Sequence, residues 1–370
     1  MKSKSKSNHR LLGVDLFRGI AAYAIVFVHS GDESWGVPIS QAAISLRLLF
    51  YFAVPFFLAT SFFFLTARPE IDTSRRFWRS RIDRILIPYG IWTIVYLMFR
   101  SIFFLKFQQM DRFWDVCQDP LAMFCLGGAS YHLYFLPLLF TGTFLVTIAK
   151  YLQQIRANQL VIGGLAILSL IAYEWLIKSG NSFHLNPNTA FKNLIQTTGW
   201  NIDSLPVLRF VLVQIAWLLN CFPYLLIGIL LIPLRDRIPN WNAAYRSATA
   251  CLCGMIFFGS SAAVSIGLPE IVKDVGQAYS LLLLAIILSG YIKQGWLFES
   301  VGACSFGIYL IHPFAMLGVK GLLAKILPSL ATEVSILSML TISIGSFTIA
   351  WIAIALTIKN KWVAKYALGV

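Results

Sequence analysis

The stretch LLGVDLFRGIAAYAIVFVH, residues 11–29, decides the fold of this chain. It is apolar enough to cross a membrane as one helix, yet it carries Asp15, Arg18 and His29. Charged side chains inside a membrane are costly and indicate a functional site by default. Because an α-helix turns about 100° per residue, Arg18 and His29 share one face and lie ~16 Å apart along the axis. Asp15 precedes Arg18 by one turn, where the two side chains can pair. In the purely structural alternative, Arg18 snorkels to the membrane surface and His29 caps the outer end of the helix.

The composition of the whole chain agrees with a membrane protein. Of its 370 residues, 58% are hydrophobic and 12% are charged, and the mean hydropathy is +0.73. A soluble domain carries roughly twice this charged fraction. No polar stretch is long enough to hold a core of its own, so we expect one integral membrane domain over residues 1–370. None of the six cysteines has C-x-x-C spacing, so we expect no metal site.

A membrane span needs ~20 mostly apolar residues. By this criterion the sequence predicts an all-α bundle of ten transmembrane helices. The predicted spans are 11–29, 43–67, 84–106, 132–150, 159–178, 210–233, 245–267, 278–294, 302–325 and 333–357.

Lysine and arginine residues predict the orientation of these spans, because they accumulate in cytoplasmic segments. With both termini in the cytoplasm, the inner segments carry the whole net charge of +14 and the outer segments balance. The basicity therefore indicates topology, with a partial role in binding anionic lipid headgroups, and no nucleic-acid partner is expected. In this orientation Arg18 lies near the inner face and His29 near the outer face. The longest outer loop, residues 178–209, is expected to be an irregular cap with short helical pieces.

The second important stretch is the predicted loop between spans two and three, RPEIDTSRRFWRSRIDRILIPY, residues 68–89. Arginine forks bind phosphate groups bidentately, so we expect a phosphate-rich cytosolic ligand here. The predicted donor-binding residues are Arg76, Arg79, Arg81 and Arg84. Arg81 and Arg84 are one turn apart and are predicted to point into the mouth of the bundle. In the alternative interpretation, the arginines only anchor the topology.

Two further groups of polar residues lie at predicted spans. His132 opens the fourth span on the same side as His29, as an interfacial residue or as a member of the site. In the ninth span, Ser305, Tyr309 and His312 have the spacing of one helix face. This face is either a hydrogen-bonded packing seam between helices or a substrate contact.

Five stretches together resemble the acyltransferase-3 family of integral membrane acyltransferases, in particular bacterial O-acetyltransferases of surface glycans. They are GVDLFRGIAAYAIVFVHS at 13–30, YFAVPFFLATSFFFL at 51–65, RRFWRSRIDRILIPYGIW at 75–92, YHLYFLPLLF at 131–140 and SFGIYLIHPF at 305–314. The family's Arg-x10-His pattern falls on Arg18 and His29. Its arginine-rich turn falls on Arg81 and Arg84. Its His-Leu-aromatic-Phe-Leu motif falls on His132, with a tyrosine in the place where tryptophan is more usual.

The resemblance implies transfer of an acyl group, with acetyl expected, from cytosolic acyl-CoA to a sugar hydroxyl of a cell-envelope glycan or lipid-linked precursor. Acetyl-CoA is then the donor substrate, and no permanently bound cofactor is expected. His29 is expected to be the general base or to carry the acyl group, Arg18 with Asp15 to orient the donor, and His132 to orient His29 or bind the acceptor. The predicted location is the cell (inner) membrane. The alternatives are a transporter or flippase of a polar lipid or sugar, and a non-catalytic partner in an envelope complex.

Overall fold

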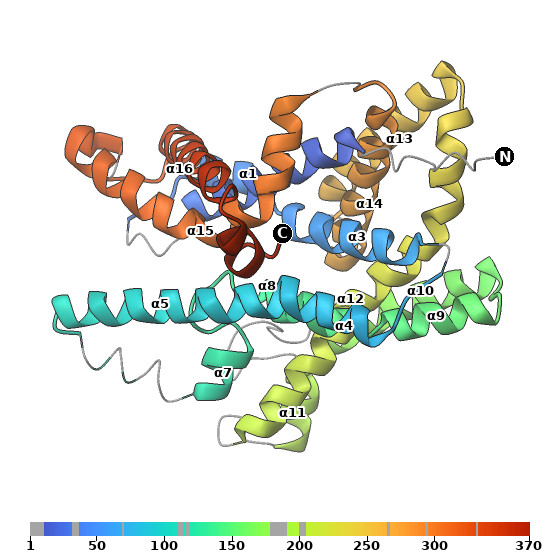
Figure 1. Cartoon of the computed structure of the whole chain (residues 1–370), viewed down its shortest axis with the longest axis horizontal. Coiled ribbons are helices and arrows are strands. Elements are labelled where there is room, and N and C mark those ends of the chain that lie inside the picture. The colour runs from blue at the N-terminus through green and yellow to red at the C-terminus, as the bar shows by residue number, and fades with distance from the viewer. Residues whose placement is uncertain are drawn as a thin grey trace. The chain divides into compact units, whose positions relative to one another are not determined.

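The computed structural model describes residues 11–31, 37–68, 70–109, 111, 114, 119–177, 191–199, 205–264, 267–292, 295–330 and 332–370. All regular elements of this part of the chain are helices (Figure 1), which confirms the predicted all-α class. Of the outer loop predicted over 178–209, residues 178–190 and 200–204 lie outside the described residues. The short helix α11, Lys192–Thr198, is a helical piece of the predicted kind.

Ten helical segments of the described chain are long and apolar enough to cross a membrane, which confirms the ten predicted spans. Some are made of two helices in succession. The segments are α1 (Leu12–Ser30), α2 and α3 (Gln41–Leu48 and Ala53–Thr66), α4 and α5 (Arg75–Arg81 and Ile87–Lys106), α8 and α9 (Phe135–Thr143 and Val146–Gln154), α10 (Gln159–Leu176), α12 (Pro206–Arg237), α13 (Ala243–Val264), α14 (Glu270–Ser289), α15 (Trp296–Ile326) and α16 (Ile336–Thr357). The short helix α7, Pro120–Cys125, precedes α8.

The described chain divides into two compact units, each assembled from segments that are far apart in the sequence. Unit 1 comprises Met1–Phe57, Leu234–Ser265 and Gly276–Ala355. Unit 2 comprises Leu58–Pro233, Ile266–Val275 and Leu356–Val370. The organisation as one domain over residues 1–370 stays a prediction.

Unit 1 is built on the packing of α1 against α15. At Gly302 of α15, an added Cβ atom would lie 2.6–2.8 Å from the Cβ, Cα and carbonyl oxygen of Asp15. Only a residue without a side chain allows the two helices to approach this closely, as small residues do in membrane interfaces. On α14, the Ser289 hydroxyl accepts a hydrogen bond from the Gly13 amide at 2.9 Å. The start of α1 is therefore held by two other helices of its unit.

In unit 2, the arginine-rich stretch differs from the prediction. The sequence predicts a loop before a span at 84–106, whereas the structure begins the helix at Arg75. Ser74 caps this helix, because its side chain accepts a hydrogen bond from the Phe77 amide at 3.3 Å, and Phe77 is buried. Polar caps of this kind satisfy amides that a helix start leaves without partners. The arginines from Arg75 onward are therefore arranged with helical spacing, and Figure 1 shows α4 continuing into α5.

Pro88 explains the irregular turn that joins α4 to α5. A proline has no N–H group, so Pro88 cannot donate a hydrogen bond to the Arg84 carbonyl four residues earlier. The backbone forms a π-helical turn over Ile82–Leu86, in which the Ile87 amide donates to the Ile82 carbonyl. Such turns insert an extra residue into a helix and are frequent at functional sites.

The last segment of the chain packs on this turn. A second π-helical turn, Val363–Ala367, contacts α5, and Trp92 of α5 donates a hydrogen bond from Nε1 to the Ala367 carbonyl at 2.9 Å. Gly369 has a positive φ of +63°, and a Cβ atom there would clash with the Arg84 carbonyl. Glycine at this position allows the C-terminal segment to lie directly against the arginine-bearing helix.

The orientation of the helices leads to a first testable prediction. We expect Arg75 to face the cytoplasm, because the net charge gathers on the segments assigned to that side. Arg75→Cys in a chain without its native cysteines should react with a membrane-impermeant maleimide only after the cells are opened. Labelling of intact cells would reverse the predicted topology.

Candidate active site

In unit 1, the structure pairs His29 with His312. Their ring centroids are 5.4 Å apart and the rings are stacked at an interplanar angle of 25°. His29 is near the end of α1, while His312 is in the middle of α15 and is fully buried. The Nδ1 atom of His312 lies 2.6 Å from the Tyr309 carbonyl oxygen. Because a carbonyl oxygen only accepts, Nδ1 is the protonated nitrogen, and in the neutral ring Nε2 carries the lone pair.

The end of α1 that carries His29 is anchored by its own backbone and by neighbours in unit 1. Ser30 donates from its hydroxyl to the carbonyls of Phe27 at 2.7 Å and of Met339 at 3.3 Å. Arg47 donates from Nη1 to the Gly31 carbonyl at 2.6 Å. These contacts tie α1 to α16 and to α2, so the imidazole of His29 projects from a well-held helix end.

The other predicted residues of α1 and α15 are distributed along these two helices, which pack against each other. Asp15 is buried beside Gly302, and Arg18 is half-buried one turn further along α1. The Ser305 hydroxyl donates within its own helix, to the Gly302 carbonyl at 2.8 Å. Tyr309 lies with its ring centroid 6.3 Å from that of His312. The pairing of Asp15 with Arg18 stays a prediction.

In unit 2, three of the four predicted donor-binding arginines share one cavity of about 350 Å³. Its wall is formed by one face of the arginine-bearing helix and by the C-terminal segment. The lining residues are Arg76, Arg79, Ser80, Asp83, Arg84, Lys365, Gly369 and Val370. Among the side chains of this lining, four are cationic and one is acidic, a balance that favours an anionic ligand.

Arg81 lies outside the residues that line this cavity, unlike the predicted arrangement with Arg84. Residues 76, 79, 80 and 83 have the spacing of one helix face, and Arg81 is on another face. Its guanidinium carbon lies 5.1 Å from the centroid of the Phe77 ring, in a cation–π contact. Arg81 therefore packs against its own helix.

His132 is also in unit 2, where it is buried with 3% of its surface exposed. Its Nδ1 atom is 3.1 Å from the Ser130 hydroxyl, and the Tyr96 ring meets its ring edge-on at a centroid distance of 5.1 Å. A histidine held in this way is not an exposed interfacial residue. Its predicted link to His29 stays a prediction.

The loop before His132 is fastened to α5 by two side chains. The Tyr89 hydroxyl donates to the Phe124 carbonyl at 2.9 Å and accepts from the Gly127 amide at 3.0 Å. Arg100 donates from Nη1 to the carbonyls of Gly128 and Ala129, both at 3.3 Å.

Among the described residues, no three His, Cys, Asp or Glu side chains form a group that could hold a metal ion.

The fold and these sites define the chain as a multi-pass α-helical membrane protein with histidine and arginine clusters in its helices. Residues 11–355 match a family model described as an acyltransferase domain. The chain belongs to this acyltransferase family.

Two Enterococcus faecalis proteins, each described as an amino-acid racemase, are similar over part of their length. One is 29% identical over 143 residues, covering 38% of this chain and 20% of the relative. The other is 27% identical over 190 residues, covering 50% of this chain and 25% of the relative. The chain thus spans a quarter or less of the length of these curated relatives. No solved structure matches the chain.

Two features of these sites are not evident from the sequence. Helical spacing places His312 on a packing seam or substrate contact, but it does not predict that the ring stacks on His29, although both lie on spans predicted to run in the same direction. From the sequence, Lys365 is recognised only as a cation on the predicted cytoplasmic side. No local pattern in the sequence indicates that Lys365 shares a cavity with the arginines.

Proposed function

We propose that this membrane acyltransferase moves an acyl group, with acetyl expected, from cytosolic acyl-CoA to a sugar hydroxyl of an envelope glycan or its lipid-linked precursor. The proposed location is the cell (inner) membrane. The observation that carries the donor assignment is the cationic cavity of unit 2. Coenzyme A carries several phosphate groups, and the arginine forks of this cavity suit phosphate oxygens.

The donor is proposed to bind with its phosphates between Arg76, Arg79, Arg84 and the ammonium group of Lys365. Two chain segments, one of which packs on the π-helical turn, would hold such a ligand. A ligand held in this way is oriented more precisely than a ligand bound to a flexible loop. Arg18, oriented by Asp15, is proposed to bind or orient the donor. The ~16 Å between Arg18 and His29 along α1 suits the extended pantetheine arm.

His29 is proposed as the general base. It removes the proton of the acceptor hydroxyl as the oxygen attacks the thioester carbonyl, and the C–S bond breaks to release the CoA thiolate, which takes up a proton. His312 is proposed as a positioning residue, because its ring stacks on His29 and its tautomer is set by the Tyr309 carbonyl. The buried and fastened His132 is proposed to bind the acceptor or to orient His29.

The direct test of this function uses purified protein and radiolabelled acetyl-CoA. Hydrolysis of the thioester or transfer of the label supports the enzyme. A protein that does not bind acetyl-CoA at all would instead favour the transporter or flippase, or the non-catalytic partner.

A second prediction tests the donor cavity. Arg84→Ala should raise the KM for acetyl-CoA about tenfold, as expected for the loss of a charged hydrogen bond at a partly exposed site. The value of kcat should change far less, because the phosphates are bound equally in the ground and transition states. Arg84→Lys keeps the charge without the fork and should lie between the two.

Arg75→Ala is the matched control, because Arg75 is exposed on the same helix and lies outside the lining of the cavity. Its KM should stay that of the wild type. An unchanged KM in a folded Arg84→Ala protein would place the donor elsewhere. Failure of Arg84→Ala to insert would instead support the arginines as topology anchors.

A further inference from the structure

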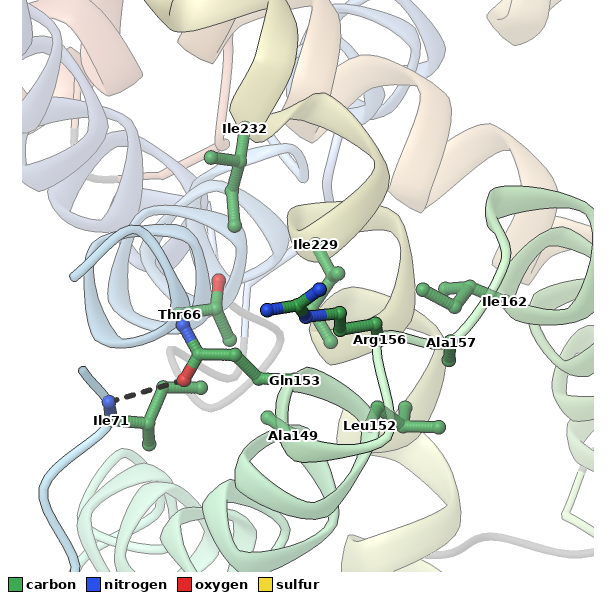
Figure 2. A pocket seen from close by; sticks show the side chains of 10 residues that line it. All are labelled: Thr66, Ile71, Ala149, Leu152, Gln153, Arg156, Ala157, Ile162, Ile229 and Ile232. Carbon is green, nitrogen blue, oxygen red and sulfur yellow. Dashed lines mark hydrogen bonds between the residues drawn. The ribbon is translucent and has the colours of Figure 1, made fainter. Parts of the chain in front are cut away.

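A second cavity of unit 2, of about 150 Å³, is separate from the arginine cavity. It lies where the end of α3, the ends of α9 and α10 that face each other along the chain, and the later part of α12 meet (Figure 2). Most of its lining is aliphatic and includes Leu152, Ile162, Ile229 and Ile232. Leu152 and Ile162 also belong to a hydrophobic cluster with Leu226. The inner part of the cavity is therefore suited to a hydrocarbon group.

Arg156 brings a charge to this apolar site. Figure 2 shows its guanidinium group reaching across the cavity towards Thr66 and Gln153. The side chain is exposed, and among the described residues that line the cavity none is acidic. The guanidinium thus lies in a largely apolar lining whose described residues include no carboxylate to neutralise it.

The backbone conformation of Arg156 is energetically unfavourable for a residue other than glycine. Arg156 has a positive φ of 49° and ends α9 in a turn where Ala157 donates to the Leu152 carbonyl at 2.9 Å and Arg156 to that of Gln153 at 3.1 Å. Helices that end in this hydrogen-bond pattern usually have glycine at the left-handed position. A non-glycine residue there costs of order 1 kcal/mol. Glycine would adopt this turn without that cost, but it would not supply a guanidinium group.

Two charged residues that neighbour the lining in the sequence, Lys150 and Asp72, have contacts of their own. Lys150 donates from Nζ to the Thr73 hydroxyl at 3.0 Å. The pKa of the Asp72 carboxyl is lowered, mainly by the hydrogen bond it accepts from the Ser74 amide and in smaller part by the charge of Lys150. The charge of Lys150 is therefore partly balanced by that of Asp72, and Arg156 is the cation among the described residues that line the cavity.

The surroundings of the cavity favour a lipid over a soluble anion. Leu160 and Val161, which precede Ile162 on α10, are 82% and 55% exposed. In a multi-pass membrane protein, such an exposed aliphatic face contacts lipid. The predicted orientation also puts this end of α9 and α10 on the cytoplasmic side, where anionic lipids are attracted by basic residues.

We propose that this cavity binds one anionic phospholipid, with its phosphate on Arg156 and part of an acyl chain against the isoleucine side chains. This assignment is independent of the donor and acceptor proposed above. The shared chemistry of a phosphate group on arginine also fits inorganic phosphate, which lacks the chain.

The test measures lipid binding to the purified full chain in detergent by native mass spectrometry, with added phosphatidylglycerol, phosphatidylcholine or inorganic phosphate. Arg156→Gly keeps the left-handed turn and removes only the side chain. It should lower the affinity for phosphatidylglycerol about tenfold, the loss expected for a charge-assisted hydrogen bond. Ala157→Phe fills the cavity without changing charge and should weaken the same binding. Lys361→Ala, which removes an exposed cation of unit 2 outside the cavity, should bind as the wild type.

The proposal also requires that the wild type binds phosphatidylglycerol more tightly than phosphatidylcholine and that inorganic phosphate competes poorly. Wild-type affinity in Arg156→Gly, or in Ala157→Phe if the glycine variant does not fold, would overturn the lipid site. Equal binding of the two lipids would remove the role of Arg156. Effective competition by inorganic phosphate, with normal binding in Ala157→Phe, would identify an anion site without a chain pocket.

Discussion

His29→Ala should lower kcat for acyl transfer by about 10²–10⁴-fold, the usual effect of losing a general base. The affinity for acetyl-CoA should hold, because the proposed phosphate contacts lie in the cavity of Arg76, Arg79 and Arg84. Expression and thermal stability should also hold, since His29 is only partly buried. The measurement is steady-state transfer of label from acetyl-CoA, with kcat and KM determined separately.

The control for this variant is Ile20→Ala, which shortens an exposed side chain on the same helix and should leave kcat unchanged. Near-normal turnover in a folded His29→Ala protein would show that another group removes the proton.

His312 gives a second readout on the same pair. His312→Phe keeps an aromatic ring in the stack but removes both ring nitrogens. Because His312 is proposed only to position His29, kcat should fall less than in His29→Ala, and the KM for acetyl-CoA should hold. An unchanged kcat would assign His312 to packing alone.

The second large effect is expected at Gly302. Gly302→Leu should lower the free energy of unfolding by about 1–3 kcal/mol or more. The first atom of the new side chain would meet Asp15 Cα, Cβ and carbonyl oxygen at 2.6–2.8 Å. Two of these atoms belong to the backbone, so α1 as a whole must move away from α15. Because α1 carries Arg18 and His29, activity should fall with stability.

Gly318→Leu is the matched control, because this glycine is on the same helix and a Cβ atom there has no neighbour within 4 Å. Thermal unfolding in detergent, followed by size-exclusion chromatography, compares the two variants. Equal melting temperatures for Gly302→Leu and Gly318→Leu would contradict the close packing of α1 on α15.

The sequence by itself determined the number of membrane helices and their approximate ends. The thickness of the hydrocarbon core requires a run of about 20 apolar residues whatever the helix packs against, so the signal is local. The motif from 13 to 30, with the four that follow it, was also sufficient for the family. The start of α4 at Arg75 is not evident in the sequence. The run of arginines is typical of a polar loop, so Ser74 is not recognised as a helix cap.

Only the tertiary structure decided which polar side chains come together. Helical spacing predicts which residues share a face of one helix, but not which other helix that face meets. His312 joins His29 because Gly302 lets α15 approach α1. Arg84 shares a cavity with Lys365 because the distant C-terminal segment packs on the π-helical turn that carries Arg84. These contacts depend on how closely the backbones of segments far apart in the chain approach each other. No local pattern of residues determines that distance.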